Sequence, residues 1–184
     1  MLLRLSKLRY KASLQDIIYN SERNIKKESI ALMSDCSFIE RAQNVIITGA
    51  TGSGKSFLAC ALGNQACLHA YRTLYFNMNR FTEQLSLAKL QGTYIKWLNQ
   101  LKKADLIILD DFGLQQLDQN AKLALLQMLE DRYDYKSTII VSQLPIEHWH
   151  SFINEPTIAD AILDRILAKC FNFDLKGKSL RIKI

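Results

Sequence analysis

Residues typical of turns and linkers are scarce in this sequence of 184 residues, which holds only two prolines and seven glycines. Flexible linkers are rich in glycine, serine or proline, so we expect none of any length. The sequence also shows no internal repeat and no low-complexity stretch. Its length favours a single domain with enough chain to bury a core.

Long apolar runs are missing as well. No stretch of about 18 apolar residues occurs, so the sequence predicts no membrane-spanning helix. Its first residues alternate apolar with basic side chains and lack the apolar centre and cleavage site of a signal peptide. The four cysteines, Cys36, Cys60, Cys67 and Cys170, show no CxxC spacing. They predict the reduced, partly buried thiols of a cytoplasmic protein.

Charge is plentiful but unevenly spread. The net charge is +6. Residues 1–28, 80–103 and 165–184 carry +4, +4 and +5, whereas residues 110–160 carry −6. Basic regions on either side of a more acidic centre indicate a polyanionic partner beyond a nucleotide, with nucleic acid the first candidate. The alternative is an ordinary surface of solvated lysines.

Short apolar runs alternate with helical stretches along most of the chain. The predicted strands are residues 44–48, 73–77, 105–110, 138–142 and 170–175. The predicted helices are residues 56–71, two segments within 79–103 that break near Gln91 and Gly92, a helix capped by Asp118 that runs to about Tyr133, and 157–168. Strands separated by helices predict an α/β fold with a parallel sheet and helices on both faces. Residues 1–43 show only short helices and loops.

A glycine-rich motif, G-x-x-x-x-G-K-[ST], follows the first predicted strand. Its residues are Gly49, Ala50, Thr51, Gly52, Ser53, Gly54, Lys55 and Ser56, and Phe57 comes next. Glycines let successive backbone N–H groups point at phosphate oxygens, and the following helix directs its positive dipole end at the same place. Lys55 supplies a charge to the β and γ phosphates, and the Ser56 hydroxyl ligates Mg²⁺. We therefore expect these nine residues to bind ATP.

Two carboxylates end the third predicted strand, which is where ligands bind in a parallel sheet. Asp110 would hold Mg²⁺, through water, and Asp111 would orient or deprotonate the attacking water. Alternatively, the pair caps a turn. The N-K-x-D pattern of guanine recognition is absent, which favours ATP.

Polar residues at the end of the next strand and within a later helix are further candidates for the nucleotide site. Ser142 and Gln143 follow the strand predicted beside that of Asp110, where a side chain can contact the γ-phosphate; they could equally be a strand exit before Pro145. Arg165 would ordinarily be a solvated helix residue. His69, His148 and His150 show no metal-ligand spacing, so they indicate surface or packing positions.

The motifs, in this order and spacing, resemble the IstB-like ATP-binding proteins, which are transposase helper ATPases of the AAA+ class similar to DnaC-type helicase loaders. The resemblance covers nearly the whole chain from Tyr10. Its most specific stretches are residues 130–133, 142–149, 159–165 and 175–181. It implies a three-layer P-loop sandwich with a central five-stranded parallel sheet.

What the resemblance implies about roles can be stated by position. Asp110 and Asp111 look like the Walker B pair, and Ser142 with Gln143 looks like the first sensor region, with the sensing side chain left open. Arg165 looks like an arginine finger, which would complete the ATP site of a neighbouring subunit. Arg181 is similar to a last arginine of the family and is implied to contact the γ-phosphate. The implied cofactors are ATP and Mg²⁺.

The resemblance also bears on domains. Residues 1–43 are expected to be a helical and linker segment packed on an ATPase core of residues 44–184. Residues 143–184 are too few for the full helical lid of larger AAA+ proteins, so we expect little or no lid. Family members carry several dozen further helical residues ahead of the part that matches Tyr10, implied to help bind DNA or the transposase. The sequence given before Tyr10 is too short to hold them.

The leading hypothesis is an ATP-hydrolysing, DNA-binding assembly factor that assists a transposase and self-associates with ATP. The nearest alternative is a loader of a replicative helicase. A P-loop small-molecule kinase is disfavoured, because no arginine cluster follows Asp111 to cover a second phosphate site. A binder that does not hydrolyse ATP is also possible, although Lys55 and Asp110 are both present.

Overall fold

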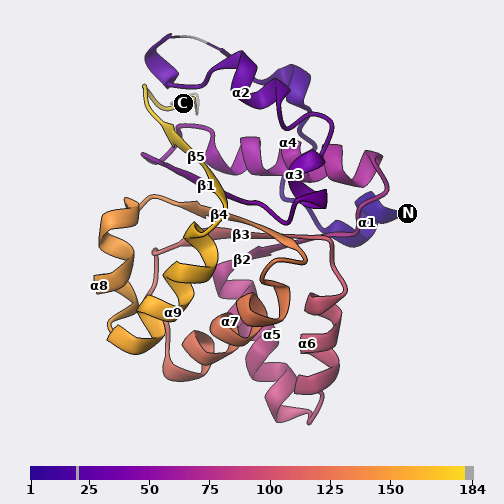
Figure 1. Cartoon of the computed structure of the whole chain (residues 1–184), viewed down its shortest axis with the longest axis vertical. Helices are drawn as coiled ribbons and strands as arrows, with labels where there is room; N and C mark the ends of the chain where they lie inside the picture. Colours follow the sequence, from indigo (N-terminus) through magenta and orange to yellow (C-terminus); the bar gives the residue numbers. More distant parts are fainter. Residues whose placement is uncertain (20, 181–184) are drawn as a thin grey trace.

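Five short strands form one parallel sheet at the centre of the molecule (Figure 1), as the sequence predicts. The computed structural model describes residues 1–19 and 21–180. The strands are β1 (Asn44–Gly49), β2 (Thr73–Asn77), β3 (Leu106–Phe112), β4 (Ser137–Ser142) and β5 (Cys170–Leu175). Their order across the sheet is β2-β3-β4-β1-β5, and every neighbouring pair is parallel. The order places the carboxyl ends of β1, β3 and β4 side by side.

Strand β3 differs from its prediction at the end that carries the two carboxylates. It runs on to Phe112, and its pairing with β4 shifts register between Leu109 and Phe112. The irregularity therefore falls on Asp110 and Asp111. A bulge of this kind re-aims side chains and is common beside functional sites.

One layer of helices covers the face of the sheet drawn lower in Figure 1. It contains α5 (Met78–Leu90), α6 (Tyr94–Lys102), α7 (Gln119–Arg132), α8 (Trp149–Ile153) and α9 (Pro156–Leu167). Their apolar sides bury Ile46, Ile107 and Ile140 of the sheet in one cluster. Asp118 caps α7 by accepting a hydrogen bond from the N–H of Ala121 at 2.7 Å, as predicted.

The short helix α8 was missed by the sequence analysis. It forms around Trp149, which is fully buried and donates its indole N–H to the carbonyl oxygen of Leu144 at 2.9 Å. Trp149 also packs edge-on against Phe112. The stretch that contains His148 and His150 is therefore held by packing. The described part of the chain holds no group of three or more potential metal-ligating His, Cys, Asp or Glu residues.

The opposite face is covered by α4 (Lys55–Leu68) together with the start of the chain. That segment holds α1 (Leu2–Ser6), α2 (Lys27–Ala31), α3 (Ser37–Glu40) and two short 3-10 helices, η1 (Leu14–Asp16) and η2 (Ser21–Arg23). Its apolar side chains share one buried cluster with α4 and with Val45, Ile47 and Ile108 of the sheet. The division into two parts at residue 43 stays a prediction. Within residues 1–19 and 21–180, no helix is long and apolar enough to cross a membrane.

Candidate nucleotide-binding site

The glycine-rich loop joins β1 to α4 at the carboxyl edge of the sheet. Gly49 and Gly54 have φ angles of 140° and 93°, which side chains rarely tolerate. A Cβ at Gly49 would also lie 2.2 Å from the carbonyl oxygen of Leu175, so only glycine fits between β1 and the end of β5. The Lys55 ammonium folds back over the loop and donates to the carbonyl oxygen of Ala50 at 2.8 Å.

The Ser56 hydroxyl and the first carboxylate meet at the base of this loop. Ser56 Oγ donates to Asp110 Oδ1 at 3.0 Å, and the Tyr75 hydroxyl donates to Asp110 Oδ2 at 2.6 Å. These two bonds fix both carboxylate oxygens of Asp110, which is fully buried. Burial and the neighbouring Asp110 raise the pKa of the Tyr75 hydroxyl, which therefore remains a donor. Tyr75 was missed by the sequence analysis because it lies on β2, 35 residues before Asp110.

The second carboxylate, Asp111, faces the open side of the loop. Its φ angle is 60°, in the left-handed region that aspartate tolerates better than most residues. Asn77 donates its side-chain N–H to Asp111 Oδ2, and the Arg9 guanidinium lies 3.6 Å from the same oxygen. Burial and Asp110 raise the pKa of Asp111, while Arg9 and Asn77 oppose the rise. Asp111 is thus an anchored carboxylate with one side toward solvent.

The structure separates the two residues left open as sensor candidates. Ser142 is buried, and its hydroxyl donates to the carbonyl oxygen of Phe112 at 2.6 Å while accepting from the N–H of Leu144 at 3.0 Å. Gln143 is exposed, and its Oε1 accepts from the Thr51 hydroxyl at 2.7 Å. Gln143 therefore lies against the glycine-rich loop, whereas Ser142 ties the end of β4 to β3.

A cavity of about 420 Å³ lies between the loop, Asp111 and the start of the chain. Its lining residues are Arg9, Tyr10, Thr51, Gly52, Gly54, Lys55, Ser56, Phe57, Asp111, Gln143 and Leu180. The Tyr10 and Phe57 rings are tilted by 43° with centroids 6.4 Å apart, and the Arg9 guanidinium lies over the Tyr10 ring. Arg9 was not among the predicted site residues. Only the fold brings it there, because no local motif marks it.

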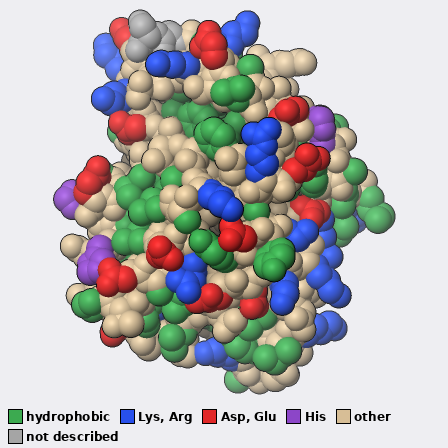
Figure 2. Space-filling view, viewed as in Figure 1, with side chains coloured by type: hydrophobic (Ala, Val, Ile, Leu, Met, Phe, Trp, Pro, Cys, Tyr) green, Lys and Arg blue, Asp and Glu red, His purple; other side chains and the backbone are tan. Residues whose placement is uncertain are grey.

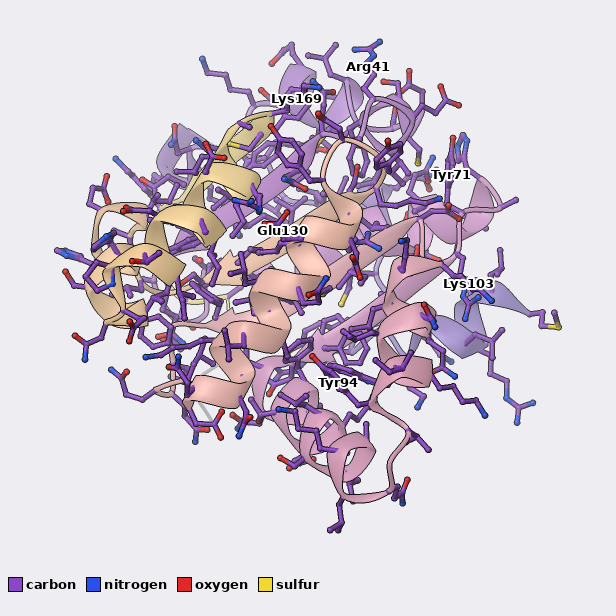
Figure 3. The ribbon with its side chains drawn as sticks, turned by 60° about the horizontal axis from the view of Figure 1, so that its bottom comes forward. Arg41, Tyr71, Tyr94, Lys103, Glu130 and Lys169 are labelled. Atoms are coloured by element: carbon purple, nitrogen blue, oxygen red, sulfur yellow. The ribbon has the colours of Figure 1, made fainter. Side chains whose placement is uncertain are left out.

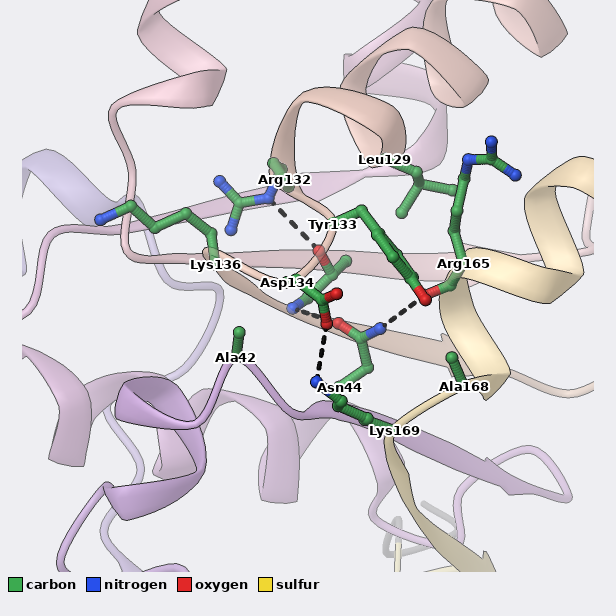
Figure 4. A pocket seen from close by; sticks show the side chains of 11 residues that line it. Ala42, Asn44, Leu129, Arg132, Tyr133, Asp134, Lys136, Arg165, Ala168 and Lys169 are labelled. Carbon is green, nitrogen blue, oxygen red and sulfur yellow. Dashed lines mark hydrogen bonds and ion pairs between the residues drawn. The ribbon is translucent and has the colours of Figure 1, made fainter.

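Arg165 lies at the other edge of the sheet. The Asn44 side chain, at the amino end of β1, donates to the carbonyl oxygen of Arg165 at 3.0 Å, and Figure 4 shows both residues beside Ala168. The guanidinium binds Glu130 and the carbonyl oxygen of Ala161. An arginine on this helix would ordinarily be solvated, but the Arg165 side chain is only 22% exposed, because α9 packs on α7 here (Figure 3).

Arg165 is therefore far from the loop of its own chain, at the opposite ends of the strands. Arg181, the remaining predicted residue, lies outside the described residues. The roles of both residues stay predictions.

The residues that are present fit ATP with Mg²⁺. Ser56 Oγ and Asp110 Oδ1 are adjacent oxygen atoms at the base of the cavity, of the hard type that Mg²⁺ prefers as ligands. Protein sites hold Mg²⁺ through one or two such ligands and complete its shell with water and phosphate oxygens. The glycine-rich loop and the Lys55 ammonium supply the groups that bind phosphate.

Comparison with known proteins shows the family of this chain. A family model described as IstB-like ATP binding protein matches residues 1–184. The chain belongs to the IstB-like family. This IstB-like chain is 44% identical over 179 residues to an insertion sequence ATP-binding protein of Sinorhizobium fredii, covering 97% of this chain and 73% of the relative. It is 30% identical over 182 residues to the insertion sequence IS5376 ATP-binding protein of Geobacillus stearothermophilus, covering 99% and 72%.

Solved structures show the same fold. The replication initiator DnaA bound to AMPPCP and single-stranded DNA superposes with a TM-score of 0.74 at 20% identity, covering 94% of this chain and 52% of DnaA. The DnaC helicase loader gives 0.68 at 20% identity, covering 91% of this chain and 98% of DnaC. Both are AAA+ P-loop proteins. At this identity the likeness shows the fold alone, and it confirms the predicted AAA+ sandwich.

Proposed function

We propose that this IstB-like chain hydrolyses ATP and acts as a DNA-binding assembly factor that assists the transposase of an insertion sequence. The observation that carries the proposal is the junction of Ser56 and Asp110 beneath a glycine-rich loop, with Asp111 anchored beside it. Relatives named as insertion sequence ATP-binding proteins support the biological setting.

The chemistry follows from the placement of side chains. The loop and Lys55 would bind the phosphates, and Ser56 with Asp110 would hold Mg²⁺, which would supply positive charge to the phosphate oxygens. Asp111 points one carboxylate side into the cavity, where it orients the attacking water and accepts its proton. Gln143 lies across the cavity beside Thr51, where its amide can donate to the γ-phosphate or the water. Arg165 cannot reach this site in its own chain, so it would serve a neighbour's ATP.

Exposed cations on one side of the molecule support contact with DNA. Figure 2 shows Lys and Arg side chains gathered over α1 and α6, and Figure 3 shows Lys103 on the α1 side of the molecule. Lys96, Lys102 and Lys103 are all exposed. Lys89 is less available, because it donates to Asn120 Oδ1 at 2.5 Å and lies over the Tyr94 ring.

A basic groove also adjoins the catalytic carboxylate. It has a volume of about 600 Å³, and its lining sets three cations, Lys7, Arg9 and Arg80, against two carboxylates, Glu83 and Asp111. Cations in such a groove suit a phosphodiester backbone and carry no base-specific pattern. We therefore expect DNA binding that is strong at low salt and weakly dependent on sequence.

The test combines turnover, assembly and partner choice. The purified chain should hydrolyse ATP with Mg²⁺, and light scattering after size exclusion should show larger species only with ATP and duplex DNA. The transposase of the same insertion sequence should then bind these species. Absence of turnover with ATP, Mg²⁺ and DNA would refute hydrolysis. Binding to the replicative helicase, with no binding to the transposase, would favour the loader function instead.

A further inference from the structure

A buried arginine touches the glycine-rich loop from its outer side. Arg23 ends η2 in the segment that precedes the sheet, and only 5% of it is exposed. Its Nη2 donates to the carbonyl oxygen of Ser53. A Cβ at Gly54 would lie 2.8 Å from the same nitrogen. The guanidinium thus binds Ser53 and leaves no room for a side chain at Gly54.

The charge of Arg23 has no counter-ion among the described residues. Its Nε and Nη1 are buried and make no hydrogen bond, and the ion pairs found in the described part of the chain do not include it. Burial lowers the pKa of Arg23 accordingly. A buried charge without a partner is costly, and such a group is conspicuous in a folded protein.

A second buried arginine, in contrast, has a guanidinium with several hydrogen-bond partners. Arg132 is 1% exposed, and its guanidinium donates to the carbonyl oxygens of Leu101, Ala104 and Ser137. Its role is explained by these bonds. Arg23 has a single carbonyl partner, so hydrogen bonds within the described chain leave its charge largely uncompensated.

The contact with Ser53 also orients the loop. The C=O of one residue and the N–H of the next point in opposite directions across a trans peptide. Because the Ser53 carbonyl points out to Arg23, the N–H of Gly54 points to the inner side, where the phosphates bind. The Gly52 carbonyl is likewise engaged from outside, by the N–H of Leu180 at 2.9 Å.

We propose that Arg23 is a positioning residue of the nucleotide site whose missing counter-ion is the polyphosphate of ATP. It holds the Ser53 carbonyl outward and places a full positive charge behind the loop, on the side away from the cavity. Arg23 acts through the loop and does not touch the nucleotide. This inference rests on the proposed ATP binding, and it adds a cation that the glycine-rich motif does not contain.

The decisive experiment compares Arg23→Met, Arg23→Lys and Arg132→Met by thermal unfolding and by titration with ATP, ADP and AMP. Arg23→Met should weaken ATP binding roughly tenfold, with a smaller loss for ADP and the smallest for AMP. Because an uncompensated charge is removed, the nucleotide-free protein should melt no lower than the wild type. Arg23→Lys keeps the charge and should bind ATP within about threefold of the wild type.

The control should behave in the opposite way. Arg132→Met should lower the melting temperature with and without ATP and leave ATP affinity unchanged. The loss caused by Arg23→Met should also change little between low and high salt, because buried charges are screened weakly.

The outcomes are distinguishable. A wild-type chain that does not bind ATP refutes the proposed function itself. Wild-type binding with an equal affinity in Arg23→Met, or with equal losses for ATP and AMP, overturns the role of Arg23. If Arg23→Met does not fold, Arg23→Lys decides: an ATP affinity near that of the wild type supports the charge, and a tenfold loss overturns it.

Discussion

The hydroxyl of Ser56 lies 3.0 Å from Oδ1 of Asp110, so that the glycine-rich loop and the carboxylate strand meet at one point. Tyr75 fixes the other oxygen of Asp110, and the pair is therefore preorganised as a hard-oxygen site. Asp111, the next residue, turns away into the cavity because β3 shifts register there. One strand end thus carries two carboxylates in different environments.

The first prediction concerns phosphate binding. Lys55→Ala should abolish tight ATP binding, because the phosphates lose a charge that lies inside the loop. Isothermal titration with ATP and Mg²⁺ measures this directly. Lys136→Ala is the control, since Lys136 pairs with Asp105 at the other edge of the sheet and should leave ATP affinity unchanged. Equal ATP affinities of wild type and Lys55→Ala would contradict the assignment of the loop.

The second prediction separates binding from turnover. Asp111→Asn keeps the side-chain volume and tolerates the left-handed backbone, but it loses the basic oxygen. ATP should bind with near-normal affinity while hydrolysis falls by about 10²-fold or more. Steady-state phosphate release together with a binding titration tests both halves. Turnover close to that of the wild type would remove Asp111 from the chemistry.

The third prediction tests the two residues at the end of β4. Gln143→Ala should lower the rate of hydrolysis without changing the melting temperature, because Gln143 is exposed beside Thr51. Ser142→Ala should lower the stability by about 1–3 kcal/mol, because the N–H of Leu144 loses its buried partner. A Ser142→Ala protein with normal stability and no turnover would reverse this division of roles.

The fourth prediction concerns DNA. If α6 contacts phosphates, DNA affinity should fall with salt at a log–log slope near −0.9 for each phosphate contacted. Lys96→Glu and Lys102→Glu should weaken binding and reduce that slope. Lys27→Glu makes the same charge change on α2, in the other helix layer, and should have little effect. Equal losses in all three variants would indicate that only net charge matters.

The fifth prediction places Arg165 in the ATP site of a neighbouring subunit. Arg165→Ala should fold and bind ATP but lose turnover, by roughly 10³-fold or more if the arginine acts as it does in related phosphoryl transfers. Because Glu130 holds the guanidinium in the free chain, Glu130→Gln should ease its release and leave turnover intact.

Mixing decides whether Arg165 acts between subunits. Arg165→Ala and Lys55→Ala proteins are each expected to be inactive, yet an interface in which the first binds ATP and the second supplies Arg165 has both groups. Partial recovery of hydrolysis in the mixture, measured on DNA at high protein concentration, supports the prediction. Proven co-assembly without recovery would mean that Arg165 only packs α9 against α7.

The sequence by itself determined the strands, the glycine-rich loop and the two carboxylates. Each is a local pattern: apolar runs of strand length, glycines at fixed spacing and aspartates directly after a buried strand. The resemblance to the IstB-like family carried the prediction further, to the AAA+ sandwich that the structural neighbours confirm. Roles assigned to Arg165 and Arg181 remain predictions.

Only the tertiary structure decided which distant residues surround that loop. Arg23 and Arg9 come from the start of the chain, and Tyr75 comes from β2, yet all three contact the loop or its carboxylates. No local pattern marks them, because their neighbours are chosen by the order of strands and by packing across the sheet. Tertiary structure also decided between Ser142 and Gln143, which are adjacent in sequence. Their side chains point to opposite sides at the end of β4, so Ser142 is buried and binds Phe112, whereas Gln143 lies at the cavity.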